Sequence, residues 1–236
     1  MKQKETLWNT MDNHNKDIDI DRDEEAMDDH VMSSLDTPLR SDAFDLSNAE
    51  KVEIIKGHFH EIMHTLGLDL TDDSLKGTPL RVAKMYVNEI FSGLHPDNKP
   101  VARRFENKYK YHKMLVERDI TVYSSCEHHF VPIIGKAHVA YIPNEHVIGL
   151  SKLNRIVHYY ARRPQVQERM TMQIANELKQ ALQTENVAVM IEADHLCVMS
   201  RGVGDVSSST ITAEYSGLFD QQEYRTEFLG HIRSKS

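Results

Sequence analysis

The chain contains little cysteine: only two of its 236 residues, Cys126 and Cys197, carry a thiol. Two cysteines are too few for a disulfide scaffold. The N-terminal region has no apolar secretory segment, and no stretch approaches the roughly 20 apolar residues that a membrane-spanning helix needs. We therefore exclude disulfide-stapled and membrane-spanning classes and expect a soluble, cytoplasmic protein without a membrane partner.

An excess of basic charge is also lacking. The formal net charge is -8. Residues 1–48 account for all of it, because they contain 13 acidic residues and only 5 basic ones. The remaining chain is balanced and offers no strongly basic face for a nucleic-acid backbone, so we expect no nucleic-acid partner. Local clusters of Arg and Lys within it can still bind a small polyanion.

Residues 1–48 are rich in Asp, poor in apolar residues and without sustained periodicity, which predicts a mostly disordered acidic tail. The acidic run at 17–23 superficially resembles a calcium loop. It lacks the central Gly and the correctly spaced terminal Glu of such a loop. The run is therefore interpreted as solvated.

The chain becomes periodic from about Ser47. Apolar residues at three- and four-residue spacing predict a helix that stops at Gly67, and a second helix opens at Thr78-Pro79, with Thr78 as its cap, and runs to Gly93. Alternating segments predict strands at 119–124, 136–142, 187–191 and 207–215, and helices are expected at 151–162, 166–183 and 221–231. Strand pair, helix pair and strand pair together indicate an α+β domain with helices on one face of an antiparallel sheet.

Both cysteines belong to short clusters with histidine, C-E-H-H at 126–129 and H-L-C at 195–197. A turn can aim Cys126 and His129 at one ion, and residues two apart on a strand share a face. Two thiolates and one imidazole suit zinc and leave a fourth position for water, as in catalytic sites. Cys126, His129 and Cys197 fit this role best, with His128 and His195 beside them as proton carriers.

Other interpretations of the two clusters remain open. His128 or His195 as a fourth ligand would close a structural zinc site, as in a non-catalytic, ring-forming binding module. Both cysteines could also be unligated buried thiols. A zinc nucleoside deaminase is disfavoured, because the chain has neither an H-x-E segment nor a downstream P-C-x-x-C.

Cations recur near these clusters at Lys152 and Arg155, at Arg81 and Lys84, and at Arg201. Each pair taken alone is an ordinary solvated helix face. Together, and with Ser151 at the N-terminus of a helix, they favour an anionic substrate. Gln167 and Glu168 open the following helix. Glu168 either favours the positive helix end or accepts hydrogen bonds from a nucleobase edge.

Four segments in order resemble the signature segments of the GTP cyclohydrolase I family. They are S-C-E-H-H-F at 125–130, G-L-S-K-L-N-R at 149–155, R-P-Q-V-Q-E-R at 163–169, and H-L-C at 195–197 with R-G at 201–202. The resemblance extends from about residue 49 to the C-terminus. A lone C-x-x-H would not be specific, whereas four ordered segments are.

This resemblance implies a tunnelling fold over 118–236, preceded by a helical segment and linker over 49–117 and by the tail at 1–48. It also implies a ring-shaped homodecamer with active sites between subunits. The implied reaction converts GTP and water to 7,8-dihydroneopterin triphosphate and formate, a first step toward folate or tetrahydropterin.

Site residues follow from the same resemblance. Zinc would be held by Cys126, His129 and Cys197, and protons would be carried by His195 and His128. The guanine edge would be bound by Glu168, helped by Gln167, and Ser151 would lie near the ribose. The triphosphate would be held by Lys152, Arg155, Arg81, Lys84 and Arg201, some of them from a neighbouring subunit.

Overall fold

The computed structural model describes residues 35–101 and 103–233, all within one compact unit. The acidic run at 17–23 lies outside the described residues. Residues 35–47 contain neither helix nor strand. Within the described ranges, no helix is both long and apolar enough to span a membrane.

The first described helix, α2, spans Asn48–Thr65. Ser47 caps it: its hydroxyl accepts from the backbone N–H of Glu50, and the Glu50 carboxylate accepts from the backbone N–H of Ser47. This reciprocal capping box satisfies two N–H groups at the helix start. Gly67 follows the helix at φ 80°, a conformation that favours glycine. The predicted limits of this helix are confirmed.

The second helix, α3, spans Thr78–Met85, and its cap is Gly77 rather than Thr78, so the predicted start was wrong by one residue. The segment then continues through a π-helical turn and two 3-10 turns, η1 (Tyr86–Ile90), η2 (Ser92–Leu94) and η3 (Pro96–Asn98). Gly93 donates its backbone N–H to the carbonyl of Arg162 at 2.9 Å. A Cβ on Gly93 would lie 2.0 Å from the Tyr159 carbonyl oxygen. This close backbone approach docks the helical segment on the rest of the unit.

The main sheet has five strands in the order β5-β2-β3-β6-β7. Their bounds are β2 Leu115–Cys126, β3 Pro132–Tyr141, β5 Pro164–Gln165, β6 Val187–His195 and β7 Thr210–Tyr215. The four longer strands pair antiparallel, as predicted. The register of β2 against β3 shifts between Glu117 and Ile120. Asp119 stands in this bulge at φ 59°.

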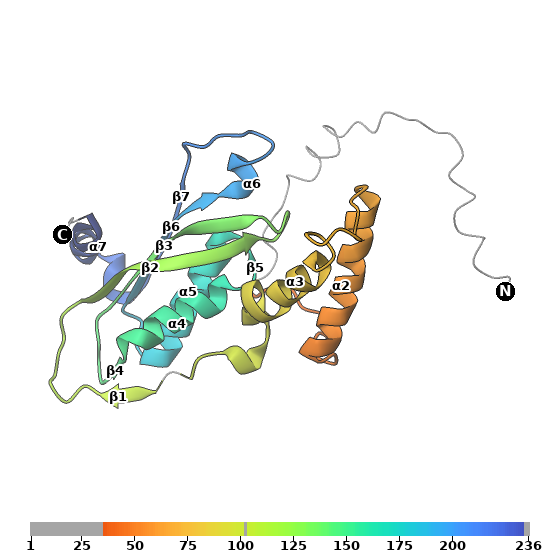
Figure 1. The fold of residues 1–236 in the computed structure, drawn as a ribbon. Helices are drawn as coiled ribbons and strands as arrows, with labels where there is room; N and C mark the ends of the chain where they lie inside the picture. The colour runs from red at the N-terminus through yellow and green to blue at the C-terminus, as the bar shows by residue number, and fades with distance from the viewer. Residues whose placement is uncertain (1–34, 102, 234–236) are drawn as a thin grey trace. The chain divides into compact units, whose positions relative to one another are not determined.

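The two faces of the sheet carry different cores. Helices α4 (Leu150–Ala161) and α5 (Gln167–Leu182) cover one face (Figure 1). There, Val139 and Tyr141 of β3 are buried against them. The alternate residue Ala140 faces a second core with Phe219 and Phe228, which come from η4 (Gly217–Asp220) and α7 (Gln222–Arg233). The predicted helix pair on one face is confirmed.

Four short elements were not predicted. Strand β5 pairs parallel with the end of β2, which makes the sheet mixed rather than purely antiparallel. Strands β1 (Arg104–Glu106) and β4 (His146–Ile148) form a separate antiparallel ribbon. The four-residue helix α6 (Leu196–Met199) follows β6 directly. The parallel pairing fixes the chain entering α5 beside Cys126.

Candidate metal centre and active site

Cys126, His129 and Cys197 meet although the two cysteines are 71 positions apart. Cys126 ends β2, and Cys197 lies in α6, immediately after β6. Both strands run antiparallel to β3, so they point in the same direction and their C-terminal ends lie at the same end of the sheet (Figure 1). One ligand atom from each residue lies within 4.8 Å of the others. The sequence-predicted ligands therefore form a group that could hold a metal ion.

The chemistry of this group fits a thiophilic cation. Burial, together with the neighbouring Cys126 thiol, raises the pKa of Cys197 to about 11. The Cys197 thiol therefore resists ionisation in this setting, and a divalent cation bound beside it would reverse that preference. Two thiolates and an imidazole are a common zinc donor set. Arg201 lies close by, with Nη1 2.7 Å from Nε2 of His129.

His195 is held by Gln167. The Gln167 side chain is buried, and its amide nitrogen lies 3.1 Å from the Ile191 carbonyl, 3.0 Å from the Thr210 carbonyl and 3.2 Å from Oγ1 of Thr212. Carbonyl oxygens only accept, so the amide nitrogen must face them and Oε1 must face Nε2 of His195, at 2.8 Å. Nε2 therefore carries a hydrogen. In the neutral ring, Nδ1 is left to exchange a proton.

Glu168 stands between two buried neighbours and is itself exposed. Burial lowers the pKa of His195, and the Glu168 carboxylate is close enough to oppose that effect. Glu168 thus offers a carboxylate to a ligand near His195. The side chain of Gln167 does not, because its amide is used inside the protein. The sequence suggested a base contact for Gln167, whereas its observed contacts are those of a support for His195.

His128 lies next to the metal group without joining it. Its Nδ1 is 3.6 Å from Sγ of Cys126, and its Nε2 is 3.9 Å from the carboxylate of Glu127. Among the described residues, the group whose ligand atoms are all mutually close contains neither His128 nor His195. This arrangement favours three protein ligands over a closed set of four.

Ser151 and Lys152 lie away from the metal group of their own chain. The C-terminal end of α4 leads into β5 beside Cys126. Lys152 is nine residues before the end of the helix, about 14 Å along its axis. Near that start, the amide of Asn154 donates to Glu117 at the far end of β2, at 3.0 Å. One chain therefore does not bring these residues to its own metal group.

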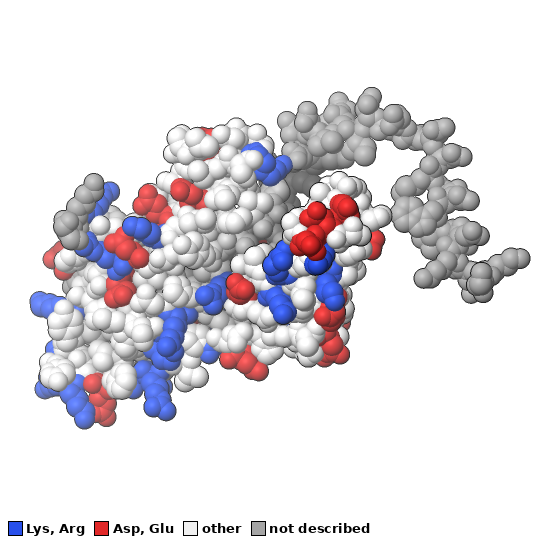
Figure 2. Space-filling view, in the orientation of Figure 1, with Lys and Arg blue, Asp and Glu red and all other residues white. Residues whose placement is uncertain are grey.

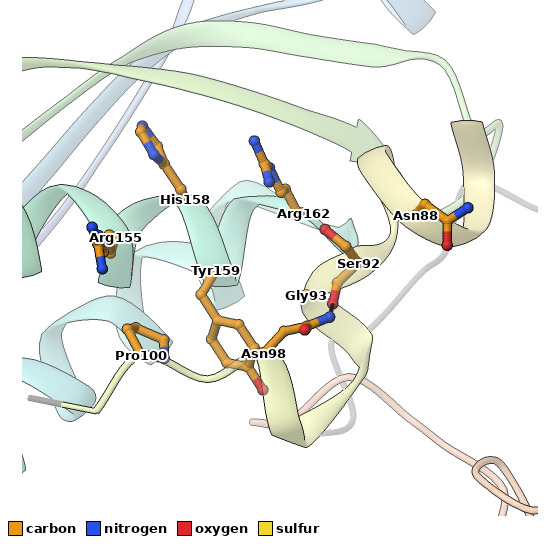
Figure 3. A pocket seen from close by; sticks show the side chains of 9 residues that line it. All are labelled: Asn88, Ser92, Gly93, Asn98, Pro100, Arg155, His158, Tyr159 and Arg162. Atoms are coloured by element: carbon orange, nitrogen blue, oxygen red, sulfur yellow. Dashed lines mark hydrogen bonds between the residues drawn. The ribbon is translucent and has the colours of Figure 1, made fainter. Parts of the chain in front are cut away.

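Arg155 lines a cavity of about 410 Å³ beside α4. Arg155 and His158 of α4, and Arg162 immediately after it, line this cavity (Figure 3). Burial lowers the pKa of His158, and the Arg162 guanidinium adds to the effect. On the face shown in Figure 2, Lys and Arg side chains are interspersed with Asp and Glu rather than gathered into one basic surface. The cavity is thus a local cationic feature.

Arg81 and Lys84 lie on α3, outside the metal group. Arg81 Nη2 donates to the Ser74 carbonyl at 3.2 Å and to Oγ1 of Thr78 at 2.9 Å. Arg81 therefore braces the loop that leads into α3. Lys84, three residues further along α3, is exposed.

Two residues at the centre escaped the sequence interpretation. Arg169 is buried on α5, and its guanidinium forms an ion pair with the carboxylate of Glu127 inside the C-E-H-H turn. Nothing in the spacing of these residues marks them as partners. The one available signal was that each lies inside a motif segment that already contains candidate site residues.

Known proteins resemble this chain over nearly all of its length. The family model for GTP cyclohydrolase I matches residues 55–233. The GTP cyclohydrolase 1 of Flavobacterium johnsoniae is 60% identical over 210 residues, which cover 89% of this chain and 94% of that protein. The GTP cyclohydrolase 1 proteins of Citrobacter koseri and Salmonella gallinarum are 54% identical over 204 residues, covering 86% of this chain and 92% of each. The chain therefore belongs to the GTP cyclohydrolase I family of enzymes.

Proposed function

We propose that this enzyme opens the imidazole ring of guanine in GTP by hydrolysis, releasing formate and forming 7,8-dihydroneopterin triphosphate. The observation that carries the proposal is the meeting of a Cys-His-Cys group with a supported histidine, His195, and an exposed carboxylate, Glu168. Membership of the GTP cyclohydrolase I family supports GTP as the substrate.

Cys126, His129 and Cys197 would hold a zinc ion. Their thiol and imidazole donors, mutually within 4.8 Å, suit that ion better than an oxygen-preferring one. When bound with an open fourth position, zinc lowers the pKa of water from its usual value toward ~7, which supplies hydroxide at neutral pH.

His195 would donate a proton to nitrogen 7 of guanine, which makes carbon 8 more electrophilic toward water. Gln167 supports this role, because it holds the ring at Nε2 and leaves Nδ1 free to exchange the proton. The lowered pKa of His195 makes the protonated ring a stronger acid toward nitrogen 7. His128 would serve later transfers, including opening of the ribose ring, before a second hydration releases formate and an Amadori-type rearrangement closes the pterin.

Glu168 would accept hydrogen bonds from the N–H groups of the guanine edge. Its exposure at the first turn of α5 and its proximity to His195 support this assignment. A charged acceptor strengthens such bonds and selects a base that offers two donors on one edge. Gln167 would contribute indirectly, through His195.

The triphosphate would be held by cations from more than one copy of the chain. We assign Lys152, Arg155, Arg81, Lys84 and Arg201 to it, with Ser151 near the ribose. The separation of the start of α4 from the metal group within one chain supports sites that lie between subunits. The α+β architecture, with two helices on one face of a curled sheet, is compatible with the tunnelling fold and a ring-shaped homodecamer.

The proposal is tested by incubating zinc-loaded protein with GTP and measuring formate and, after oxidation, a fluorescent pterin. Both products are expected in stoichiometric amounts. Metal-replete protein that yields neither would refute the function. A closed structural zinc site would instead give no products and would have a fourth protein ligand. If the site is open and catalytic, Cys197→Ala should abolish metal content and products together, whereas His195→Ala should retain the metal.

A further inference from the structure

Glu127 lies between Cys126 and His129 in the sequence, and its carboxylate forms an ion pair with Arg169 of α5. Arg169, in the first turn of α5, is 3% exposed. Its Nη1 donates to Oε2 of Glu127, and its Nη2 donates to Oε1 at 3.3 Å. Two parallel N–H···O contacts from one guanidinium fix the carboxylate in both position and orientation.

The backbone around Glu127 forms a tight turn. The Cys126 carbonyl accepts from the N–H of Phe130 at 2.8 Å, and Phe130 itself has φ 54°. The Glu127 N–H donates to the Gln165 carbonyl at 3.0 Å, within the short parallel pairing. The turn is therefore joined to the chain entering α5 through its backbone, and to α5 itself through the ion pair.

The first turn of α5 directs three successive side chains at three parts of the site. Gln167 supports His195, Glu168 is exposed beside it, and Arg169 holds Glu127. A single helix start thus connects the metal-binding turn to the proposed guanine-binding carboxylate. A shift of either part would be transmitted to the other.

We propose that the Glu127–Arg169 ion pair is a positioning device that presets the C-E-H-H turn for metal binding and fixes its distance from the first turn of α5. This inference rests on the proposed function in taking Cys126, His129 and Cys197 as the metal ligands. Arg169 touches no reacting atom and is a positioning residue. Because the ion pair orders the turn before the metal binds, the free energy of metal binding does not have to offset the conformational entropy lost in ordering it.

Loss of the pair should therefore weaken metal binding. Partners that orient metal ligands from outside typically change metal affinity 10–100-fold when they are replaced. We expect about a 10-fold loss of Zn²⁺ affinity in Glu127→Gln, which keeps the side-chain volume, and in Arg169→Lys, which keeps the charge but loses the planar fork. The double variant should lose no more than the larger single loss, because the two residues act as one unit.

The experiment is a competition between the protein and a chromophoric chelator for Zn²⁺ at fixed pH, repeated with Co²⁺ to record its absorption spectrum. Glu177→Gln is the matched control. Glu177 is also a half-buried carboxylate partner on α5, accepting from Tyr160 at 2.9 Å and from Lys99 at 2.6 Å, outside the metal group. The control should bind Zn²⁺ within twofold of the unaltered protein, with an unchanged Co²⁺ spectrum.

The inference would be overturned if folded Glu127→Gln bound Zn²⁺ within twofold of the unaltered protein. It would also be overturned if the fold-losses of Zn²⁺ affinity in the two single variants multiplied in the double variant. If Arg169→Lys does not fold, as circular dichroism would reveal, Glu127→Gln decides alone. The readout needs no GTP. A protein that binds Zn²⁺ but releases no formate would contradict the proposed function and leave this inference standing.

Discussion

Replacing Gln167 by leucine should separate the support of His195 from the metal group. The amide of Gln167 is bonded to the Ile191 and Thr210 carbonyls and to Nε2 of His195. Leucine would leave the buried Ile191 carbonyl, the part-buried Thr210 carbonyl and one imidazole N–H without this partner. An unsatisfied buried group costs about 1–3 kcal/mol. Since strand carbonyls have a second lone pair that other donors can use, we take the lower end for each, a total of about 3 kcal/mol.

A loss of that size should lower the midpoint of thermal unfolding by roughly 6–12 °C in a chain of this length. Formate release per site should fall about 10–100-fold in kcat, as for loss of a positioned general acid, while zinc content stays full. Thr212→Val is the control, because it removes one contact of Gln167, together with the contact between the Thr212 and Thr171 hydroxyls, without touching His195. It should cost about 1 kcal/mol and leave kcat nearly unchanged. Full kcat in folded Gln167→Leu would refute the assigned role.

Three further predictions concern the metal, acid stability and the docking of the helical segment. Cys197→Ala should lose both zinc and turnover, whereas His195→Ala should keep zinc by elemental analysis and lose rate; zinc loss in the latter would indicate a closed structural site. Burial holds the pKa of His138 below its ordinary value, so its contribution to stability is complete above about pH 6.5 and is lost as the pH falls below that value. Melting curves at pH 7.5 and 5.5 should therefore show a smaller acid loss in His138→Gln, and an equal loss would contradict this. Gly93→Ala places a Cβ 2.0 Å from a backbone carbonyl oxygen and should destabilise the folded protein by more than about 2 kcal/mol. Gly57→Ala lies in open space within α2 and should stabilise the folded protein by up to about 1 kcal/mol. The melting temperatures of the two variants check both expectations.

Elements with local causes were predictable. The helix over Asn48–Thr65 has its cap, its periodicity and its stopping glycine within the sequence, and its limits were correct. The start of α3 was placed one residue late, because Thr78 is a good cap by composition but Gly77 holds the position. Strand β5 could not be predicted, since two residues carry no periodicity and their pairing with β2 depends on where α4 ends.

The candidate site also contains some features that the sequence predicted and others that only the fold decided. Cys126, His129 and Cys197 were identified as partners because thiols and imidazoles at short spacing have few other uses, and the shared neighbour β3 brings them together. The burial of Gln167 was not visible, because the same amide next to a carboxylate could face either side of a helix start. Packing of α5 against β6 and β7 decides that direction.

By itself, the sequence determined which residues are candidates for the chemistry, because donor type and spacing are properties of the chain. Only the tertiary structure decided how they are supported. The Arg169–Glu127 ion pair and the Gln167–His195 contact join residues 42 and 28 positions apart. The remoteness of Lys152 from the metal group of its own chain was likewise decided by the fold. Contacts of this kind depend on the direction in which each element packs, and no local pattern in the chain records that direction.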